Sequence, residues 1–298
     1  CKSREVIKKG KRNGVRRYRC KNCGKRFQNK RRPNRIQAVL WRQYIWERQT
    51  LEQLAKRHGR SIPWIQKQLD AAPLKKQRTS PKPIIAVTDT TFFGRHYGIL
   101  AVRCPELKRN LYWREVISET PSGYLRARQE LERLGFQIRG AVTDGKRGVM
   151  RVFEDIPVQM CQFHQIAIVR RYVTSRPRLE AGKELRAITL ALPTLRESTF
   201  SDLLNEWHGR WKEFLKERTY SEDGRHWAYT HKRIRSAYRS LRTNLPYLFT
   251  YRKYPKLRMP NTTNSIDGYF SKIKGLLNVH RGLTAKRRYK IIQEILGN

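Results

Sequence analysis

The sequence predicts an α/β fold, because short apolar strands and amphipathic helices alternate from residue 84 onward. Their chain order is the second observation: three strands in a row, then helix, strand, helix and strand. The expected elements are strands at 84–89, 98–104 and 111–118, a helix at 121–134, a strand at 136–144, a short helix at 149–154 and a strand at 158–161. The third observation is that two of these strands end in an aspartate.

Those acids are Asp89 and Asp144, and a third, Asp267, falls in the first turn of a helix expected after Asn261–Ser265. Only 24 acidic residues face 66 basic ones, so acids in such settings stand out. Carboxylates that converge from rigid elements can hold divalent cations against a phosphate. The pattern therefore predicts a metal-dependent nuclease site, although a strand-end aspartate taken alone is more often a turn-capping residue.

The order of elements is that of the ribonuclease H-like fold, in which the first and fourth strands are neighbours. Asp89 and Asp144 would then emerge side by side at one sheet edge. We expect a ribonuclease H-like core with an all-helical insertion, preceded by a zinc ribbon and a helix-turn-helix.

The charge of the chain indicates a polyanionic partner. The formal net charge is +42, and Lys and Arg are spread along the whole sequence. Such a charge repels itself unless a polyanion neutralises it, so nucleic acid is expected, with a ribosomal-type RNA binder as the alternative. No run reaches the roughly 18 to 20 apolar residues of a membrane span, and no secretory signal is visible. Five cysteines favour a reducing interior, so a cytoplasmic, nucleoid-associated bacterial protein is expected.

Residues 1–30 are typical of a zinc ribbon. Cys20-x-x-Cys23 is followed by a glycine, and two thiolates across such a turn can hold one tetrahedral ion. Eighteen residues separate Cys1 from Cys20, the gap expected between two knuckles of a ribbon. The site has three of four zinc ligands, and we expect the fourth upstream. The alternative is that these cysteines are ordinary small core residues.

Residues 33–72 predict a helix-turn-helix DNA-binding domain. Pro33 ends the ribbon, Thr50 with Gln53 forms a capping box, and Gly59 supplies the turn. The third helix would present Gln66 and Lys67 to DNA. A plain three-helix packing unit is the alternative, and a basic, Pro-rich linker covers 73–83.

Two further motifs carry a resemblance to a known family. They are Cys161-x-x-His164 and Asn261-Thr262-Thr263-Asn264-Ser265-Ile266-Asp267-Gly268. Together with Asp89 and Asp144, they resemble bacterial insertion-sequence transposases related to the plant Mutator elements. The resemblance implies a DNA transposase that binds terminal inverted repeats and cuts and joins strands. It also implies that Asp89, Asp144 and Asp267 bind Mg²⁺ or Mn²⁺, although the family's third acid is normally Glu.

The resemblance also divides the rest of the chain. Residues 84–164 and 259–298 would form the two parts of the core, and 165–258 a helical insertion. The chain would act as a homo-oligomer on double-stranded transposon ends and target DNA. Basic residues near the chemistry are expected to contact DNA: His164, Lys272, Lys274 and Arg287. His164 could instead orient an acid, or pack against a buried cysteine.

Three other functions are compatible with parts of the pattern. A catalytically inactive, transposase-derived regulator would keep the DNA-binding modules without cutting. An RNA-directed nuclease would use the same acids on hybrid substrates. A zinc-containing ribosomal or chromatin protein would leave the three acids without a role.

Overall fold

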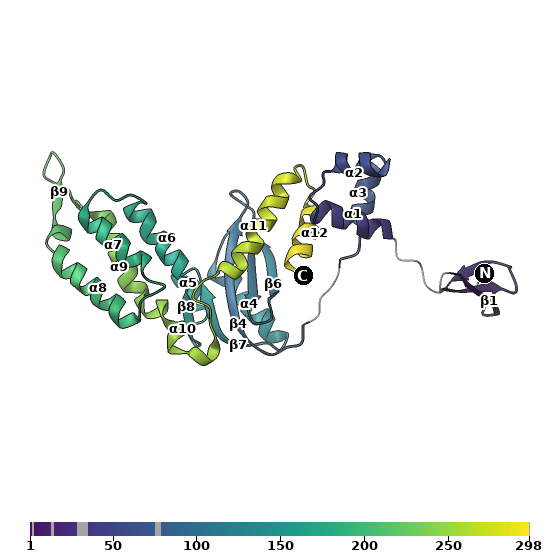
Figure 1. Ribbon diagram of the computed structural model, residues 1–298, viewed down its shortest axis with the longest axis horizontal. Coiled ribbons are helices and arrows are strands. Elements are labelled where there is room, and N and C mark those ends of the chain that lie inside the picture. Colours follow the sequence, from purple (N-terminus) through teal and green to yellow (C-terminus); the bar gives the residue numbers. More distant parts are fainter. Residues whose placement is uncertain (2, 13–14, 29–34, 75–78, 298) are drawn as a thin grey trace. The chain divides into compact units, whose positions relative to one another are not determined.

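The computed structural model describes residues 1, 3–12, 15–28, 35–74 and 79–297, and the chain divides into two units, Cys1–Leu74 and Lys75–Asn298 (Figure 1). Pro33 and part of the expected 73–83 linker lie outside the described residues.

The first unit begins with a small antiparallel sheet. Its strands are β1 (Val6–Arg12), β2 (Val15–Cys20) and β3 (Arg26–Gln28), paired in chain order. The turn between β2 and β3 is closed by Gly24, which has a φ of +69° and donates its amide to the carbonyl of Cys20. A left-handed residue without a Cβ is needed there, so this glycine sets the approach of Cys20 and Cys23.

Three helices follow: α1 (Arg35–Ile45), α2 (Leu51–His58) and α3 (Ile62–Ala71). The expected capping box at Thr50 and Gln53 is present, and Gly59 ends α2 in the left-handed conformation. Leu40, Leu54 and Ile65 are fully buried, so the predicted apolar periodicity does build a small three-helix core.

The second unit is built on a mixed five-stranded sheet of order β6-β5-β4-β7-β8. The strands are β4 (Pro83–Phe92), β5 (Gly98–Cys104), β6 (Arg109–Val116), β7 (Gln137–Thr143) and β8 (Val158–Met160). β6, β5 and β4 form an antiparallel meander, whereas β7 and β8 add in parallel. The expected α/β class and the neighbouring first and fourth strands are confirmed.

Successive residues of β4 face opposite sides of this sheet. Ala86 belongs to the large core that includes Tyr124 and Leu131 of α4 (Pro121–Arg133). Val87 packs instead with Val142 and Met259 on the other side. Two carboxyl-terminal helices contact the sheet, α11 (Asn264–Val279) at β4 and α12 (Ala285–Leu296) at β6 (Figure 1).

One strand is longer than expected. β4 does not end at Asp89 but continues to Phe92, because β5 pairs with it as far as Gly98. Asp89 therefore lies inside an antiparallel ladder, opposite Ala101. β7 pairs with β4 from Pro83 to Val87, whereas the stretch from Thr88 to Phe92 pairs with β5 alone and has no apolar run to mark it.

Between β7 and α11 the chain is mainly helical, and the edge strand β8 lies between the first two of these helices. The helices are α5 (Arg147–Arg151), α6 (Gln162–Val173), α7 (Glu180–Leu190), α8 (Glu197–Trp211), η1 (Phe214–Lys216), α9 (Lys232–Leu248), α10 (Thr250–Lys253) and η2 (Pro255–Leu257). Phe200, Leu204 and Trp207 of α8 are buried, as expected for a core stripe. α9 and α10 lie against the edge strand β8 (Figure 1).

The prediction of an all-helical insertion is wrong, because the segment also contains a β-hairpin. Its strands are β9 (Arg218–Tyr220) and β10 (Trp227–Tyr229). The hairpin turn contains Asp223-Gly224, with Gly224 at a φ of +67°, and that dipeptide is a turn signal already visible in the sequence.

None of the helices formed by the described residues is both long and apolar enough to cross a lipid bilayer.

Candidate active site

Asp89 lies within β4, and Asp144 directly follows Thr143, the last residue of the neighbouring strand β7. β4 and β7 run parallel, with Val87 opposite Val142. Each aspartate is two residues beyond its valine, so both side chains point to the face on which the two valines pack. The sheet topology therefore brings these carboxylates together, as the strand order predicted.

Asp267 approaches the same face from α11. It lies in the first turn of this helix, which packs against β4. Because three separate elements supply the acids, a rigid framework holds each of them.

The carboxyl group of Asp89 is buried, with 7% of the residue exposed. Burial is the main reason that the pKa of Asp89 is raised to about 7. The imidazole of His164 and the Thr90 amide lower this pKa, whereas the charges of Asp267 and Asp144 raise it. The three acids therefore share one electrostatic environment, in which a bound cation would stabilise the charged form of Asp89.

Cys161 and His164 lie beside these acids. Cys161 follows β8, and its amide donates to the carbonyl of Thr143, the residue before Asp144. Burial alone would raise the pKa of the Cys161 thiol, but hydrogen bonds with His164 and Thr263 bring this pKa below its ordinary value.

The pKa of His164 is raised to about 9, first by its hydrogen bond with Cys161, against the opposite effect of burial. The charges of Asp89 and Asp144 raise it further. His164 is therefore a cation at neutral pH, and its charge offsets part of the repulsion between the carboxylates.

Thr263 connects this pair to the third acid. Its amide lies 3.3 Å and its Oγ1 3.5 Å from the Cys161 sulfur, and the same Oγ1 lies 3.4 Å from Asp267 Oδ2. His164 Nδ1 is 3.5 Å from this hydroxyl. A hydroxyl has one proton to donate and can accept from an imidazolium, so Thr263 can link His164 to either Cys161 or Asp267 at one time.

A second set of hydrogen bonds fixes the segment before α11. The Gln162 amide donates to the carbonyl of Asn261, and Asn261 Nδ2 donates to Gln162 Oε1 over 2.9 Å. Thr263 is the N-cap residue of α11, yet its side chain does not cap the helix. The two sequence motifs therefore act as one unit, which positions Asp267 by its contacts with the start of α6.

The spacing of the acids does not match a single shared ion. Among the described residues, the atoms of Cys1, Cys20 and Cys23 form the one group of three or more possible ligands that all lie within 4.8 Å. The three carboxylates are spread more widely than that. Two ions, each held by some of the carboxylates, would be compatible with this wider arrangement.

Sequence reasoning missed Glu119, which precedes α4. Its carboxylate accepts hydrogen bonds from Tyr124 Oη at 2.7 Å and from Lys146 Nζ at 3.3 Å. Lys146 lies two residues after Asp144 and donates its amide to Asp144 Oδ1. Glu119 thus directs the Lys146 ammonium to itself, and Asp144 keeps an oxygen for other ligands. No local pattern marks Glu119, because its partners come from other elements.

Gly145, directly after Asp144, packs closely against the Met160 side chain. Its φ is +92°, and a Cβ there would overlap the Met160 side chain. We expect Gly145→Ala to lower the free energy of unfolding by about 2 to 4 kcal/mol. Gly209→Ala is the control, since nothing lies within 4 Å of that position and alanine favours a helix. Urea denaturation that finds both variants within about 0.5 kcal/mol of wild type would contradict the packing.

The residues expected to contact DNA differ in their exposure. Lys272 and Lys274 of α11 and Lys67 of α3 are exposed, and Gln66 and His164 are partly exposed. Arg287, in contrast, is 6% exposed and interacts within the protein. It lies one helical turn before the buried Ile291, so it shares the packed face of α12, and its surface is not available for a phosphate.

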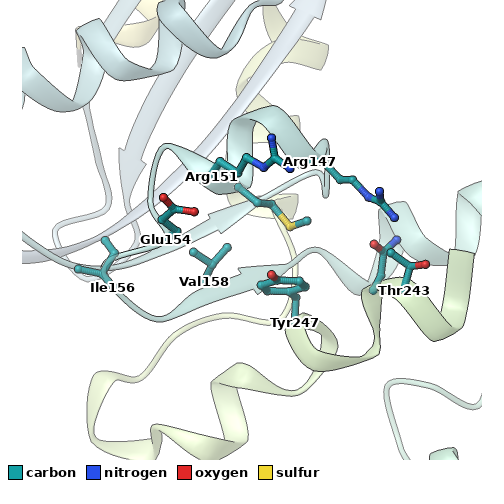
Figure 2. Close-up of a pocket in the computed structure, with 9 residues that line it drawn as sticks. Arg147, Arg151, Glu154, Ile156, Val158, Thr243 and Tyr247 are labelled. Atoms are coloured by element: carbon teal, nitrogen blue, oxygen red, sulfur yellow. The ribbon is translucent and has the colours of Figure 1, made fainter.

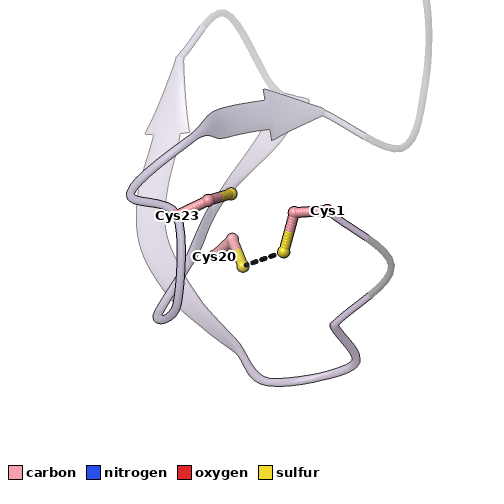
Figure 3. Close-up of side chains that lie close together, drawn as sticks. All are labelled: Cys1, Cys20 and Cys23. Carbon is pink, nitrogen blue, oxygen red and sulfur yellow. Dashed lines mark hydrogen bonds between the residues drawn. The ribbon is translucent and has the colours of Figure 1, made fainter.

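The three amino-terminal cysteines do come together (Figure 3). Cys1 and Cys20 have their sulfur atoms 3.8 Å apart, with Cys23 facing them across the turn. Sulfur atoms bound at about 2.3 Å to one tetrahedral ion are about 3.8 Å apart, so the cluster has the dimensions of a metal site.

A cavity of about 340 Å³ lies between α5 and α9 (Figure 2). Arg147 and Arg151 line one side, and Thr243 and Tyr247 line the other. Glu154 is the one acid among the described residues that line it. Because Arg147 follows Asp144 by three residues, this cavity extends positive charge away from the acids along the edge of the sheet.

Comparison with known proteins gives little further guidance. The sequence matches no protein-family model and no curated protein. Among solved structures, it is similar to the Drosophila P element transposase in a strand transfer complex. The two share 12% sequence identity over 93% of this chain and 94% of the other, with a TM-score of 0.42. The geometry of the site is therefore the basis for assigning a function.

Proposed function

We propose that the protein is a DNA transposase that cuts and joins DNA strands with divalent metal ions. The observation that carries this proposal is the meeting of Asp89, Asp144 and Asp267 over one face of the sheet, where they share an electrostatic environment. A chain of net charge +42 supplies the surface on which a polyanion would be held against them.

The residues of the site fit Mg²⁺ or Mn²⁺, because three carboxylates offer hard oxygen ligands. When bound, such ions activate a water or a 3′-hydroxyl and stabilise the charge on the phosphate. Asp89, Asp144 and Asp267 would hold them, and the Thr263 hydroxyl, 3.4 Å from Asp267 Oδ2, would orient the side chain of Asp267. The His164 cation offsets part of the repulsion between the carboxylates, and we propose that it also contacts a DNA phosphate.

We also propose a role for each segment of the chain. The core is a ribonuclease H-like domain of the Mutator-like insertion-sequence group, formed by 84–164 and 259–298, with 165–258 as its insertion. Residues 1–30 are a zinc ribbon, and 33–72 read the terminal repeats through Gln66 and Lys67. Lys272 and Lys274 contact the DNA backbone, and two or more chains hold two transposon ends.

A cleavage assay tests the function directly. Inverted repeats are first sought in the DNA that flanks the gene on both sides. The substrate is a plasmid that carries this flanking DNA. We expect the full chain to cut at the repeats in Mg²⁺ or Mn²⁺ and to leave the plasmid intact in EDTA. Tight, repeat-specific binding without any cutting in either metal would instead favour the regulator. Equal cutting in EDTA would contradict a metal-dependent mechanism.

The cysteine cluster is proposed to hold zinc. We expect about one zinc per chain by elemental analysis, and loss of most of it in Cys20→Ser, because a thiolate ligand is removed. Cys104→Ala is the control, since Cys104 is a free cysteine buried in β5, in the other unit. Zinc content that falls equally in both variants, or in neither, would contradict the assignment.

A further inference from the structure

A second hollow lies further along β4 and α11 than the acids. It has a volume of about 540 Å³ and is formed where the β4–β5 hairpin meets the turn between α11 and α12. Phe93 and Tyr97 supply its aromatic wall, with ring centroids 5.7 Å apart. The volume is within the usual range of pockets that bind small molecules.

Cations border the aromatic wall. Lys274 and Arg281 are exposed, and the guanidinium of Arg288 lies 3.8 Å from the centre of the Tyr97 ring. The Nε of Arg288 is buried and has no hydrogen-bond partner among the described residues. The described residues that line the hollow include no acid, although the Tyr97 hydroxyl donates to Glu115 Oε1 over 2.7 Å.

Ring faces combined with cations suit a nucleotide. Every base has a π-face that can stack on an aromatic ring or on a guanidinium, and the attached phosphates match the lysine and arginines. Asn278 at the rim can both donate and accept, as the edge of a base requires. A base in a duplex cannot enter, because its faces are covered by its neighbours.

The hollow is close enough to the three acids for one DNA strand to reach both. Phe93 is four residues beyond Asp89 on the hairpin, or about 13 Å at the rise of a strand. Lys274 is seven residues beyond Asp267 on α11, or about 10 Å at the rise of a helix. The hollow therefore lies about 10 to 13 Å from the acids, within a few nucleotides of a phosphate held there.

We propose that this hollow binds an unstacked nucleobase of the DNA that is held at the acids. The proposal deepens the function proposed above and rests on it for the source of the DNA. Phe93, Tyr97 and Arg288 stack on the base, while Lys274 and Arg281 bind the neighbouring phosphates. Separation of the strands close to the cut would then be stabilised by the protein.

The test measures binding of the full chain to labelled DNA by fluorescence anisotropy, with Ca²⁺ in place of Mg²⁺. Three probes are compared: a blunt 25-base-pair duplex, the same duplex with a short unpaired fork, and that fork with abasic sites. We expect wild type to bind the fork about tenfold more tightly than either other probe. Equal binding to the fork and the abasic fork would overturn the proposal.

Variants separate stacking from charge and from folding. Phe93→Leu keeps an apolar side chain but removes the ring face, so the preference for the fork is expected to disappear. Phe93→Trp should retain it, and Lys274→Ala should weaken binding to all three probes alike. Retention of the full preference in Phe93→Leu would overturn the proposal, and thermal melting shows that each variant is folded.

The base-binding site and the transposase function can each fail while the other holds. If the chain prefers the fork through Phe93 but never cuts DNA, the base-binding site is supported and the transposase proposal is rejected. If the chain cuts DNA with metal but shows no preference for the fork, the transposase proposal is supported and the base-binding site is rejected.

Discussion

Asp89→Asn is expected to abolish metal-dependent cutting and, at the same time, to stabilise the metal-free protein above pH 7. Asparagine has the shape of aspartate but is a poor ligand for Mg²⁺, so several kcal/mol of charge stabilisation are lost. That corresponds to a fall in cutting rate of about a thousandfold or more.

The gain in stability follows from the raised pKa of Asp89, about 7 in the folded protein. In the unfolded chain this group ionises near pH 4. Between these values the unfolded state binds fewer protons than the folded state, so the stability of wild type falls as the pH rises. The loss is nearly complete about one pH unit above 7 and amounts to about 4 kcal/mol. The asparagine side chain of the variant cannot ionise and is free of this loss.

Urea denaturation in EDTA at pH 5, 6.5 and 8 measures this difference. The free energy of unfolding of Asp89→Asn should exceed that of wild type by an amount that grows with pH. Saturating Mg²⁺ should restore the free energy of unfolding of the wild-type protein, since the ion stabilises the ionised carboxylate. A difference that is the same at all three pH values would contradict the burial of an ionisable group in this site.

Thr263→Val is expected to lower the cutting rate by about 10- to 100-fold while leaving DNA binding intact. Valine fills the same buried space but removes the hydroxyl that contacts Cys161, His164 and Asp267. The Thr263 amide still reaches the Cys161 sulfur, so the chain should fold. The third carboxylate would then lose the contact that holds its orientation.

Thr263→Ser is the matched control, because it keeps the hydroxyl and loses a methyl group. Cutting by the serine variant should approach that of wild type, although the small cavity costs about 1 kcal/mol of stability. Cleavage rates and urea unfolding are measured on both variants. If serine impairs cutting as much as valine does, packing rather than the hydroxyl is what matters at Thr263.

The local patterns of the sequence predicted the order of the core elements and the neighbouring places of Asp89 and Asp144. Period-two and helical patterns depend on burial of each element against one core, so they remain visible residue by residue. The capping box at Thr50 is equally local, because both partners lie within one turn.

What the sequence did not show depends on contacts between distant segments. The contact of Thr263 with Cys161 joins residues 102 positions apart, and neither motif alone reveals it. The extension of β4 to Phe92 needs the partner strand β5. Arg287 was expected on the surface from its charge, although its spacing from Ile291 placed it on the packed face.

The same contacts explain why a shared metal site can form on a strongly basic chain. β4 and β7 place two carboxylates on one face of the sheet, and α11 adds the third through its contact with the start of α6. His164 supplies a positive charge where three acids would otherwise repel one another. The site is thus held by the fold before any ion enters.

The most direct measurement is the anomalous scattering of manganese in crystals of the protein grown with DNA and Mn²⁺. Two peaks about 4 Å apart are expected between the carboxylates of Asp89, Asp144 and Asp267, each within about 2.2 Å of a carboxylate oxygen. DNA bound in the crystal with no manganese peak at any of these three side chains would contradict the account.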